Sequence, residues 1–189
     1  MAKKKFRARA FFYPLTTIIA GAKVNDRANF LTIAFCGMFH YKPPMLYISS
    51  GKNHYTNQGI KENQTFSVNF PSVDMVKETD YVGITSGKQI DKSALFDVFY
   101  GELKTAPMIN EAPMNHECKL VKILDFGGTN EIFVGEIIQT YIDEECLVNG
   151  KPDIRKLQPI LFAGLDRIYL EIGKFIGEAY KIGKEYEKK

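Results

Sequence analysis

Cysteine and histidine are scarce in this chain of 189 residues, which has three of each. The cysteines at positions 36, 118 and 146 are too few and too scattered for a disulfide framework, and none forms a C-x-x-C pair. We therefore expect a protein of the reducing cytoplasm. The histidines never recur at helical spacing, and only His116 and Cys118 could share one face of a strand. The sequence thus predicts structural roles for these residues and no metal site.

Long apolar stretches are also missing. No uninterrupted run approaches the ~20 residues that a helix needs to cross a bilayer, so we expect no contact with a membrane. A basic start followed by the apolar residues 10–22 superficially imitates a secretion signal, but Pro14 and two threonines interrupt the apolar part, and a strand is the better interpretation. We predict a basic tail over residues 1–10 and one domain over residues 11–189.

Three motifs of nucleotide binding and nucleophilic catalysis are absent. The patterns G-x-G-x-x-G, G-x-x-x-x-G-K-[ST] and G-x-S-x-G occur nowhere in the chain. These absences argue against a Rossmann-type nicotinamide site, nucleoside triphosphate hydrolysis and serine hydrolysis. The formal net charge is only +3, and the basic residues near the ends do not alternate with aromatic residues along a strand pair. We therefore expect no nucleic-acid partner.

Short segments rich in β-branched and aromatic residues, separated by Gly, Pro and Asn, dominate the chain. Residues 65–70 alternate between apolar and polar side chains, with Ser67 and Asn69 on the polar face, which predicts a half-buried strand. Gly-Gly-Thr-Asn at 127–130 and Asn149-Gly150 predict tight turns, the first of them in a hairpin. The other expected strands span residues 15–22, 31–39, 44–49, 116–126, 131–141, 159–162 and 168–172.

Helical segments are fewer and short. We expect them over residues 55–62, over 73–81 behind a Ser72 cap, over 92–96, and as an amphipathic terminal helix over 175–187. The segment 100–113 has two prolines and no periodicity, which suggests a lid or a dimer arm. Many short strands with few helices predict a mainly β protein, namely an antiparallel barrel of the Greek-key type with peripheral helices.

One polar segment joins an expected strand to an expected helix. Residues 49–56 read Ser-Ser-Gly-Lys-Asn-His-Tyr-Thr. Hydroxyl groups, a lysine, a histidine and free backbone N–H groups at a helix N-terminus suit a phosphate monoester. A solvated polar turn accounts for the same composition equally well. A second segment, residues 25–34, runs from a turn into an apolar strand and by itself predicts only a hairpin.

Taken together and in order, these segments resemble the flavin reductase-like, FMN-binding split β-barrel family, which includes flavoredoxins and the reductase components of two-component monooxygenases. The resemblance spans roughly residues 11–183. The motifs that carry it are Tyr13-Pro14, residues 29–34, Pro43-Pro44, residues 49–56, residues 66–71, Asp91-Lys92, residues 133–137 and residues 159–162. The fold that this resemblance implies is the FMN-binding split barrel.

The resemblance also implies which residues hold the cofactor, FMN. Those expected at the edge of the flavin ring, largely through backbone groups, are Asn29, Leu31, Thr32, Ile33 and Ala34. Those expected at the phosphate and ribityl end are Ser49, Ser50, Lys52, His54 and Thr56. Lys92 is expected to approach the flavin, its alternative being a solvated lysine. The chain lacks tryptophan, so Phe or Tyr must supply any stacking, and Asn130 stands near a turn where many relatives have histidine.

The activity implied by the resemblance is that of an NAD(P)H-dependent flavin oxidoreductase, which passes hydride or electrons through FMN to an acceptor that the sequence does not identify. The resemblance also implies a homodimer with the flavin at the subunit interface. The main alternative is an FMN electron carrier of the flavoredoxin type without direct NAD(P)H activity. A small barrel that binds nucleic acid and an interaction domain with a decayed flavin site are further alternatives.

Overall fold

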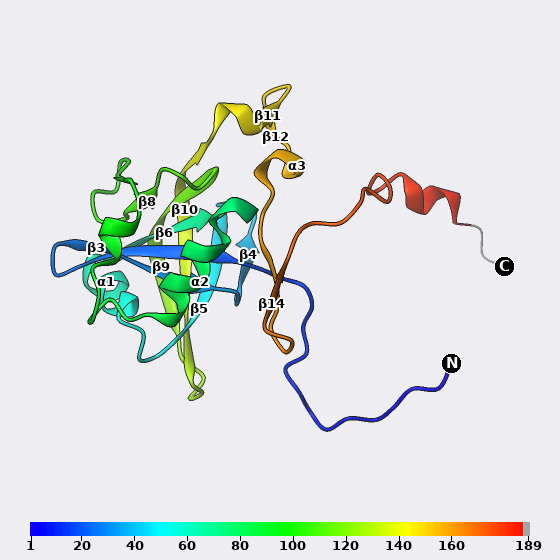
Figure 1. The fold of residues 1–189 in the computed structure, drawn as a ribbon, viewed down its shortest axis with the longest axis horizontal. Helices are drawn as coiled ribbons and strands as arrows, with labels where there is room; N and C mark the ends of the chain where they lie inside the picture. Colours follow the sequence, from blue (N-terminus) through cyan, green and yellow to red (C-terminus); the bar gives the residue numbers. More distant parts are fainter. Residues whose placement is uncertain (187–189) are drawn as a thin grey trace.

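A computed structural model of the protein describes residues 1–186. Within this range a seven-stranded antiparallel sheet has the order β3-β2-β6-β9-β10-β5-β4 (Figure 1). Its strands are β2 (Ile18–Val24), β3 (Arg27–Ile33), β4 (Cys36–His40), β5 (Met45–Gly51), β6 (Thr65–Phe70), β9 (Met114–Leu124) and β10 (Asn130–Ile142). The prediction of a mainly β, antiparallel fold is confirmed, as is the hairpin between β9 and β10.

The sheet curls into a barrel because its two edge strands follow each other in the chain. Only Ala34 and Phe35 separate the end of β3 from the start of β4, so the two edges must meet at this point. The backbone N–H of Ser49 donates to the Phe35 carbonyl at 2.7 Å, which fixes this junction against β5. The single strand predicted over residues 31–39 is therefore two strands. We refer to residues 34–35 as the seam.

Apolar side chains cover both faces of the sheet near β2 and β6. The inner cluster includes Ile18, Ile48, Phe66 and Phe133, and an outer cluster forms around Phe30. The prediction that β6 is half-buried is wrong, because Ser67 and Asn69 are fully buried on its second face. The amide of Asn69 donates to the Ile19 carbonyl at 2.8 Å and accepts from the Ile109 N–H at 3.0 Å. These bonds compensate for the loss of water and allow polar residues in a two-sided core.

Helices cover the ends and the outer face of the barrel, as predicted. They are α1 (Thr56–Asn63), the 3-10 turn η1 (Val73–Met75), α2 (Val76–Ile84) and the 3-10 turn η2 (Lys92–Leu95). Ile60 of α1 enters the inner core, and a Cβ at Gly59 would lie 2.3 Å from the Lys23 carbonyl oxygen, so glycine permits this close packing. The Ser72 cap is wrong, since its side chain forms no capping hydrogen bond.

The segment 100–113 packs against the barrel, so its prediction as a lid or arm is wrong. Its strand β8 (Met108–Ile109) pairs with β7 (Val98–Phe99), which directly precedes the segment, and Ala106 and Ala112 are buried. The carboxylate of Glu117 accepts the backbone N–H groups of residues 101, 102 and 103 at 3.0 to 3.1 Å. Apolar burial and this carboxylate hold the segment in place despite its lack of periodicity.

The C-terminal third forms smaller elements beside the barrel. They are η3 (Glu144–Cys146), β11 (Leu147–Val148), β12 (Lys151–Pro152), α3 (Ile154–Leu157), β13 (Leu161–Ala163) and β14 (Ile168–Leu170), with β13 also pairing with β1 (Leu15–Thr16). Asn149 and Gly150 both have positive φ angles, 52° and 72°, which confirms the predicted turn.

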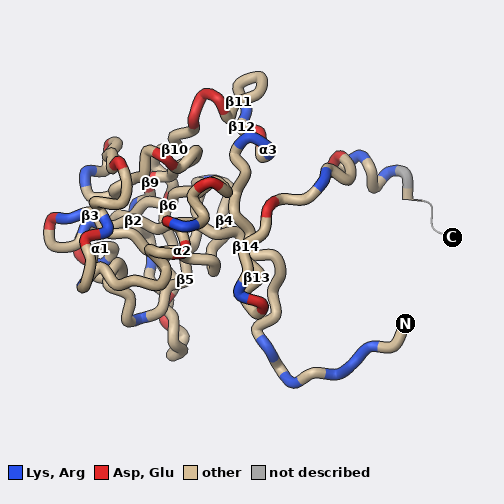
Figure 2. Tube along the Cα trace, viewed as in Figure 1, with Lys and Arg blue, Asp and Glu red and all other residues tan. Residues whose placement is uncertain are grey.

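Both terminal segments leave the barrel on the side of β14 (Figure 1). Residues 1–14 form no helix or strand, and Figure 2 shows lysine and arginine along them. The helix predicted over residues 175–187 is wrong for the part that the structure describes, where only the 3-10 turn η4 (Ile182–Glu185) forms. Gly177 and Gly183 lower its helix propensity, and residue 187 lies outside the described range. None of the helices in residues 1–186 is long and apolar enough to cross a membrane.

Candidate functional site

A cavity of about 660 Å³ opens at the seam, and we call it the central cavity. The end of β3, the seam and the end of β5 form one wall, while the C-terminal end of α2 and the β13–β14 hairpin form the other. Six of the twelve residues predicted for the site line it, namely Thr32, Ile33, Ala34, Ser49, His54 and Asn130. The Asn130 amide donates to the Ser49 hydroxyl at 3.2 Å, which joins two of them. Residues from three distant parts of the sequence therefore converge here.

A second cavity of about 570 Å³ lies at the N-terminal end of α1, and we call it the lysine cavity. Lys52, Lys61 and Lys88 line it, together with uncharged polar residues of the 53–58 segment. His54 lines both this cavity and the central cavity, so the two adjoin. The lysine cavity places Lys52 and Lys88 beside the start of α1, while Lys61 and Glu62 line it from the last turn of that helix.

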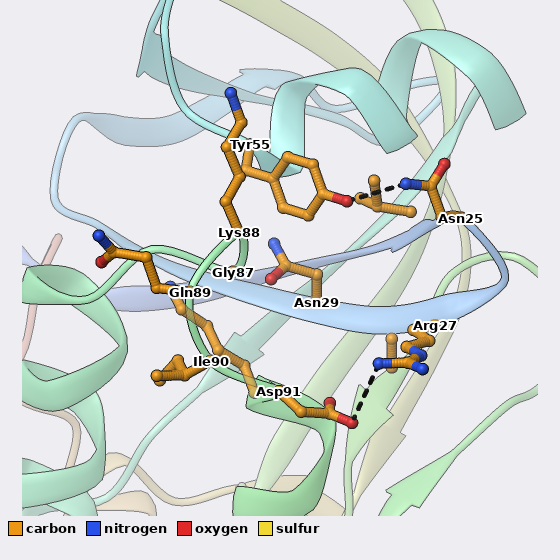
Figure 3. Close-up of a pocket in the computed structure, with 12 residues that line it drawn as sticks. Asn25, Arg27, Asn29, Tyr55, Gly87, Lys88, Gln89, Ile90 and Asp91 are labelled. Atoms are coloured by element: carbon orange, nitrogen blue, oxygen red, sulfur yellow. Dashed lines mark hydrogen bonds and ion pairs between the residues drawn. The ribbon is translucent and has the colours of Figure 1, made fainter.

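A third cavity of about 420 Å³ lies between the β2–β3 turn and residues 87–92, and we call it the turn cavity (Figure 3). Tyr55 and Lys88 line both the turn cavity and the lysine cavity. Figure 3 shows Asn29, Tyr55 and Lys88 gathered on one side, while Arg27 and Asp91 approach each other with 3.9 Å between Nη1 and Oδ2. The three cavities thus form a continuous series around the N-terminus of α1.

Free backbone donors are concentrated at this helix terminus. The N–H groups of Lys52 and His54 donate to the carbonyls of Thr129 and Gly51, both at 3.0 Å. In contrast, the N–H groups of Asn53, Tyr55 and Thr56 have no acceptor among residues 1–186. Unpaired N–H groups at a helix N-terminus, together with the helix dipole, favour an anion.

The lysines of the lysine cavity differ in how their charges are balanced. Lys52 Nζ lies 2.7 Å from Asp125 Oδ2, and Lys61 Nζ lies 2.8 Å from Glu131 Oε1. Within residues 1–186, Lys88 Nζ has no ion pair and no hydrogen bond, and it lies 5.9 Å from the centroid of the Tyr55 ring. Lys88 is therefore the cation most available to a ligand, although sequence analysis selected Lys52.

Three predicted residues have side chains that line none of these cavities. Leu31 belongs to the inner apolar cluster. Ser50 donates to Asn57 Oδ1 at 2.7 Å and also bonds His54 Nδ1 at 3.0 Å, while Thr56 Oγ1 accepts from the Asn29 amide at 2.7 Å. Ser50 and Thr56 therefore orient neighbouring residues of the cavity walls.

Lys92 is buried beside the turn cavity, and its side chain reaches the free edge of β3. Its Nζ donates to the Phe30 carbonyl at 2.9 Å and to the Val82 carbonyl at 2.7 Å, and burial lowers the pKa of the Lys92 ammonium to about 8. An ammonium has three hydrogens, and these two carbonyls use two of them. Lys92 was predicted as a site residue, and its alternative as a solvated lysine is wrong.

The backbone of β3 presents a further donor near the central cavity. Because β3 is an edge strand and the Phe30 carbonyl bonds Lys92, the backbone of Phe30 faces away from β2. Backbone direction alternates along an antiparallel strand, so the N–H group of Thr32 faces the same way. This group points out from the sheet where the central cavity begins.

His54 connects the central and lysine cavities. Burial, with a smaller contribution from the positive charge of Lys92, lowers the pKa of the His54 imidazole below its ordinary value of 6.5. The ring is therefore neutral at pH 7 and can both donate and accept a hydrogen bond. Its bond with Ser50 fixes the ring orientation.

Sequence analysis missed the wall formed by α2 and the β13–β14 hairpin. Phe162 and Tyr169 line the central cavity, and the Tyr169 hydroxyl donates to Asp80 Oδ1 at 2.9 Å, which together with burial raises the pKa of Tyr169 to about 12. Thr17 also lines the cavity, and its buried Oγ1 has no hydrogen-bond partner within the described residues. No local sequence signal marks these residues, because they meet only through the tertiary fold.

Gly87 carries a signal that sequence analysis did not use. A Cβ at this position would lie 1.9 Å from Asn29 Oδ1 and 2.9 Å from Cδ1 of Tyr55. Only glycine allows the 86–91 turn to approach so closely, and this approach places Lys88 at the helix terminus. The site therefore combines a large ring-sized space with an anion-binding end.

Comparison with known proteins gives a consistent result. The family model described as "Flavin reductase like domain" matches residues 8–162. The crystal structure of flavoredoxin from Methanosarcina acetivorans is 48% identical with a TM-score of 0.94 and covers 97% of this chain and 98% of that chain. Flavoredoxin of Desulfovibrio vulgaris (Miyazaki F) is 35% identical with a TM-score of 0.89 and covers 96% and 100%. An uncharacterized protein of Archaeoglobus fulgidus is 30% identical and covers 76% of this chain and 81% of its own length.

Proposed function

The chain belongs to the flavin reductase-like family, and from this premise we propose that it is an FMN-dependent redox protein. The ring of FMN occupies the central cavity, and the ribityl phosphate extends past His54 to the N-terminus of α1. The observation that carries this proposal is the series of adjoining cavities that ends at the free N–H groups of Asn53, Tyr55 and Thr56 beside Lys88.

The donor groups of the site fit this cofactor. A phosphate dianion that leaves water needs charge-assisted hydrogen bonds, and the helix terminus and Lys88 supply them. The outward N–H group of Thr32 suits a carbonyl or nitrogen acceptor at the edge of a flavin ring. The buried Thr17 hydroxyl without a partner gives an independent reason to expect a polar ligand atom in the central cavity.

FMN supplies the hydride and electron chemistry when it is bound, so the chain's residues bind, orient and shield it. The backbone N–H of Thr32 would donate to the edge of the ring and would stabilise the negative charge that develops there on reduction. Asn130 and Ser49 fix the β5 part of the same wall through their hydrogen bond. Phe35 and Phe162 line the central cavity and would supply the aromatic contact to the ring in a chain that has no tryptophan.

We further propose that NAD(P)H is the electron donor and that an acceptor then takes the electrons from the flavin. The alternative is a flavoredoxin-type carrier that takes electrons only from a reduced protein. The flavoredoxins among the compared structures give this alternative comparable support. Mixing the FMN-loaded protein with NADH or NADPH under anaerobic conditions decides between them. Rapid bleaching of the flavin supports the reductase, and bleaching only by a reduced protein donor supports the carrier.

We also propose a homodimer with the flavin at the subunit interface. Large apolar side chains stay exposed on the terminal segments, on β4 and around β14. They include Phe12, Met38, Phe39, Tyr41, Leu165, Ile168, Leu170, Phe175 and Ile176. Exposed apolar surface of this extent is typical of a partner interface, and it includes Phe35 beside the central cavity. Light scattering should give the mass of a dimer, and a monomer with bound FMN would contradict the interface site.

Two expectations from the sequence stay predictions, namely the domain limits and the cellular compartment. Residues 1–10 are expected to act as a basic tail outside the single domain of residues 11–189. A reducing compartment such as the cytoplasm suits Cys36, Cys118 and Cys146, which are free thiols in the structure.

A further inference from the structure

The tip of the β9–β10 hairpin carries a carboxylate that is held at both oxygens. Oδ1 of Asp125 accepts the Gly127 N–H at 2.8 Å, and Oδ2 lies 2.7 Å from Lys52 Nζ. These two interactions also hold the pKa of Asp125 below its ordinary value. The negatively charged carboxylate of Asp125 therefore helps to hold the turn in its conformation.

This carboxylate stands beside the proposed phosphate position. Lys52 lines the lysine cavity, and its backbone N–H donates to the Thr129 carbonyl at 3.0 Å, so the hairpin tip and the helix entrance are joined at this residue. The other charged groups that line this cavity are Lys61, Glu62 and Lys88, and Lys61 is paired with Glu131. Of these cations, Lys52 is the one whose carboxylate partner comes from the tip of the β9–β10 hairpin.

Asp125 and a phosphate at the helix terminus would compete for the ammonium group of Lys52. A phosphate dianion at the helix terminus gains from an approach of the Lys52 ammonium, while Asp125 already holds that ammonium in an ion pair. The side chains of Lys52 and Asp125 are 34% and 49% exposed, so this pair lies in a partly solvated region where single ion pairs contribute modestly and depend on salt. Asp125 therefore opposes phosphate binding without preventing it.

We propose that Asp125 is a specificity-determining residue that competes with the phosphate of the bound flavin for Lys52. It limits the preference of the protein for phosphorylated flavin over unphosphorylated flavin, and so permits FMN to exchange. This inference rests on the proposed function, because it takes the phosphate to lie at the N-terminus of α1.

Asp125→Asn tests the proposal, since asparagine keeps an Oδ1 that accepts the Gly127 N–H and removes only the charge. Dissociation constants for FMN and riboflavin are measured by fluorescence quenching for the wild type and the variant at low salt. We expect Asp125→Asn to bind FMN about fivefold more tightly and riboflavin within about twofold of the wild type. The gain for FMN should shrink toward zero near 1 M salt, where charges are screened within about 3 Å.

Asp153→Asn is the matched control. It removes the same charge from a carboxylate at the start of α3 that also accepts a backbone N–H, from Arg155 at 2.9 Å, and also pairs with a cation, the Arg155 guanidinium. Its FMN affinity should equal that of the wild type. If Asp125→Asn binds FMN no more tightly than the wild type, or if riboflavin gains as much affinity as FMN, the role proposed for Asp125 is wrong, while the proposed function stands. A wild-type protein that binds neither flavin overturns the proposed function and this inference together.

Discussion

Two regions of the molecule handle charge in opposite ways. Behind β9, the carboxylate of Glu117 is fully buried and accepts three backbone N–H groups and, at 3.3 Å, the hydroxyl of Tyr141. Around the N-terminus of α1, Lys52 shares one exposed carboxylate, and Lys88 has no partner among residues 1–186. A charged group whose hydrogen bonds all go to the chain itself stabilises the fold. A charged group that lies beside a cavity with unused hydrogen-bonding capacity is available to a ligand.

Lys92 stands between these two cases. It is as buried as a structural charge, with 3% of its surface exposed, yet its two carbonyl partners leave one ammonium hydrogen without an acceptor in the described residues. It also lines the turn cavity. The comparison therefore predicts that Lys92 contributes both to stability and to the site, while Glu117 contributes to stability alone.

The largest expected effect is at Glu117. Glu117→Gln replaces one carboxylate oxygen by an NH2 group that cannot accept a hydrogen bond, so at least one of the N–H groups of residues 101–103 loses its acceptor, and we expect a loss of about 3 kcal/mol in the free energy of unfolding. Urea denaturation measures this loss. Glu136→Gln on the neighbouring strand is the control, and it should change stability by less than about 0.5 kcal/mol. If Glu117→Gln has normal stability but a weakened FMN affinity, Glu117 serves the site and not the stability of the fold.

The free energy of unfolding should depend on pH through the titration of Lys92. The pKa of Lys92 is about 8 in the folded state against an ordinary value of 10.5, so between these limits the unfolded chain holds a proton that the folded chain has lost. Stability contributed by this group therefore rises with pH from about 8 to 10.5 and is constant below that window. Relative to Lys92→Met, the wild type should gain on the order of 2 kcal/mol across it. Parallel stability curves for the two proteins would show that the Lys92 ammonium keeps its ordinary pKa.

The smallest effects are expected at Lys88 and Lys52, where FMN affinity compares a lysine without a partner among residues 1–186 with a lysine that is already paired. Lys88→Ala should weaken FMN binding by about 1.5 kcal/mol, the size of a lost charge-assisted hydrogen bond. Lys52→Ala should cost less, below about 1 kcal/mol, because Asp125 already engages that ammonium. Riboflavin binding should change little in both variants. Fluorescence titrations measure all four values, and a larger loss for Lys52→Ala would return the phosphate to the position that the sequence favoured.

Much of this arrangement could be predicted from the sequence because it depends on local patterns. The alternation of residues 65–70, the turns at 127–130 and 149–150, and the polar strand-to-helix segment at 49–56 all formed the expected elements. Asn29, Thr32 and His54 were selected by resemblance to a family, and the structure places them on the cavity walls.

The remaining features depend on contacts between residues far apart in the chain. The partner of Lys52 lies 73 positions away at Asp125, and Tyr169 reaches the site only because β13 pairs with β1. Nothing local marks Lys88, whose position follows from the close contact of Gly87 with Asn29. The helix predicted over residues 175–187 did not form in the described part, where its apolar side chains face away from the barrel and have no core to pack against.

The central claim is that FMN lies along the cavities with its phosphate at the N-terminus of α1. Paired titrations of the purified wild-type protein with FMN and with riboflavin test it most directly. We predict about one FMN per chain and an affinity for FMN at least tenfold higher than for riboflavin, because only FMN carries the dianion that the free N–H groups and Lys88 bind. Equal affinities for the two flavins, or no binding of either, would contradict the account.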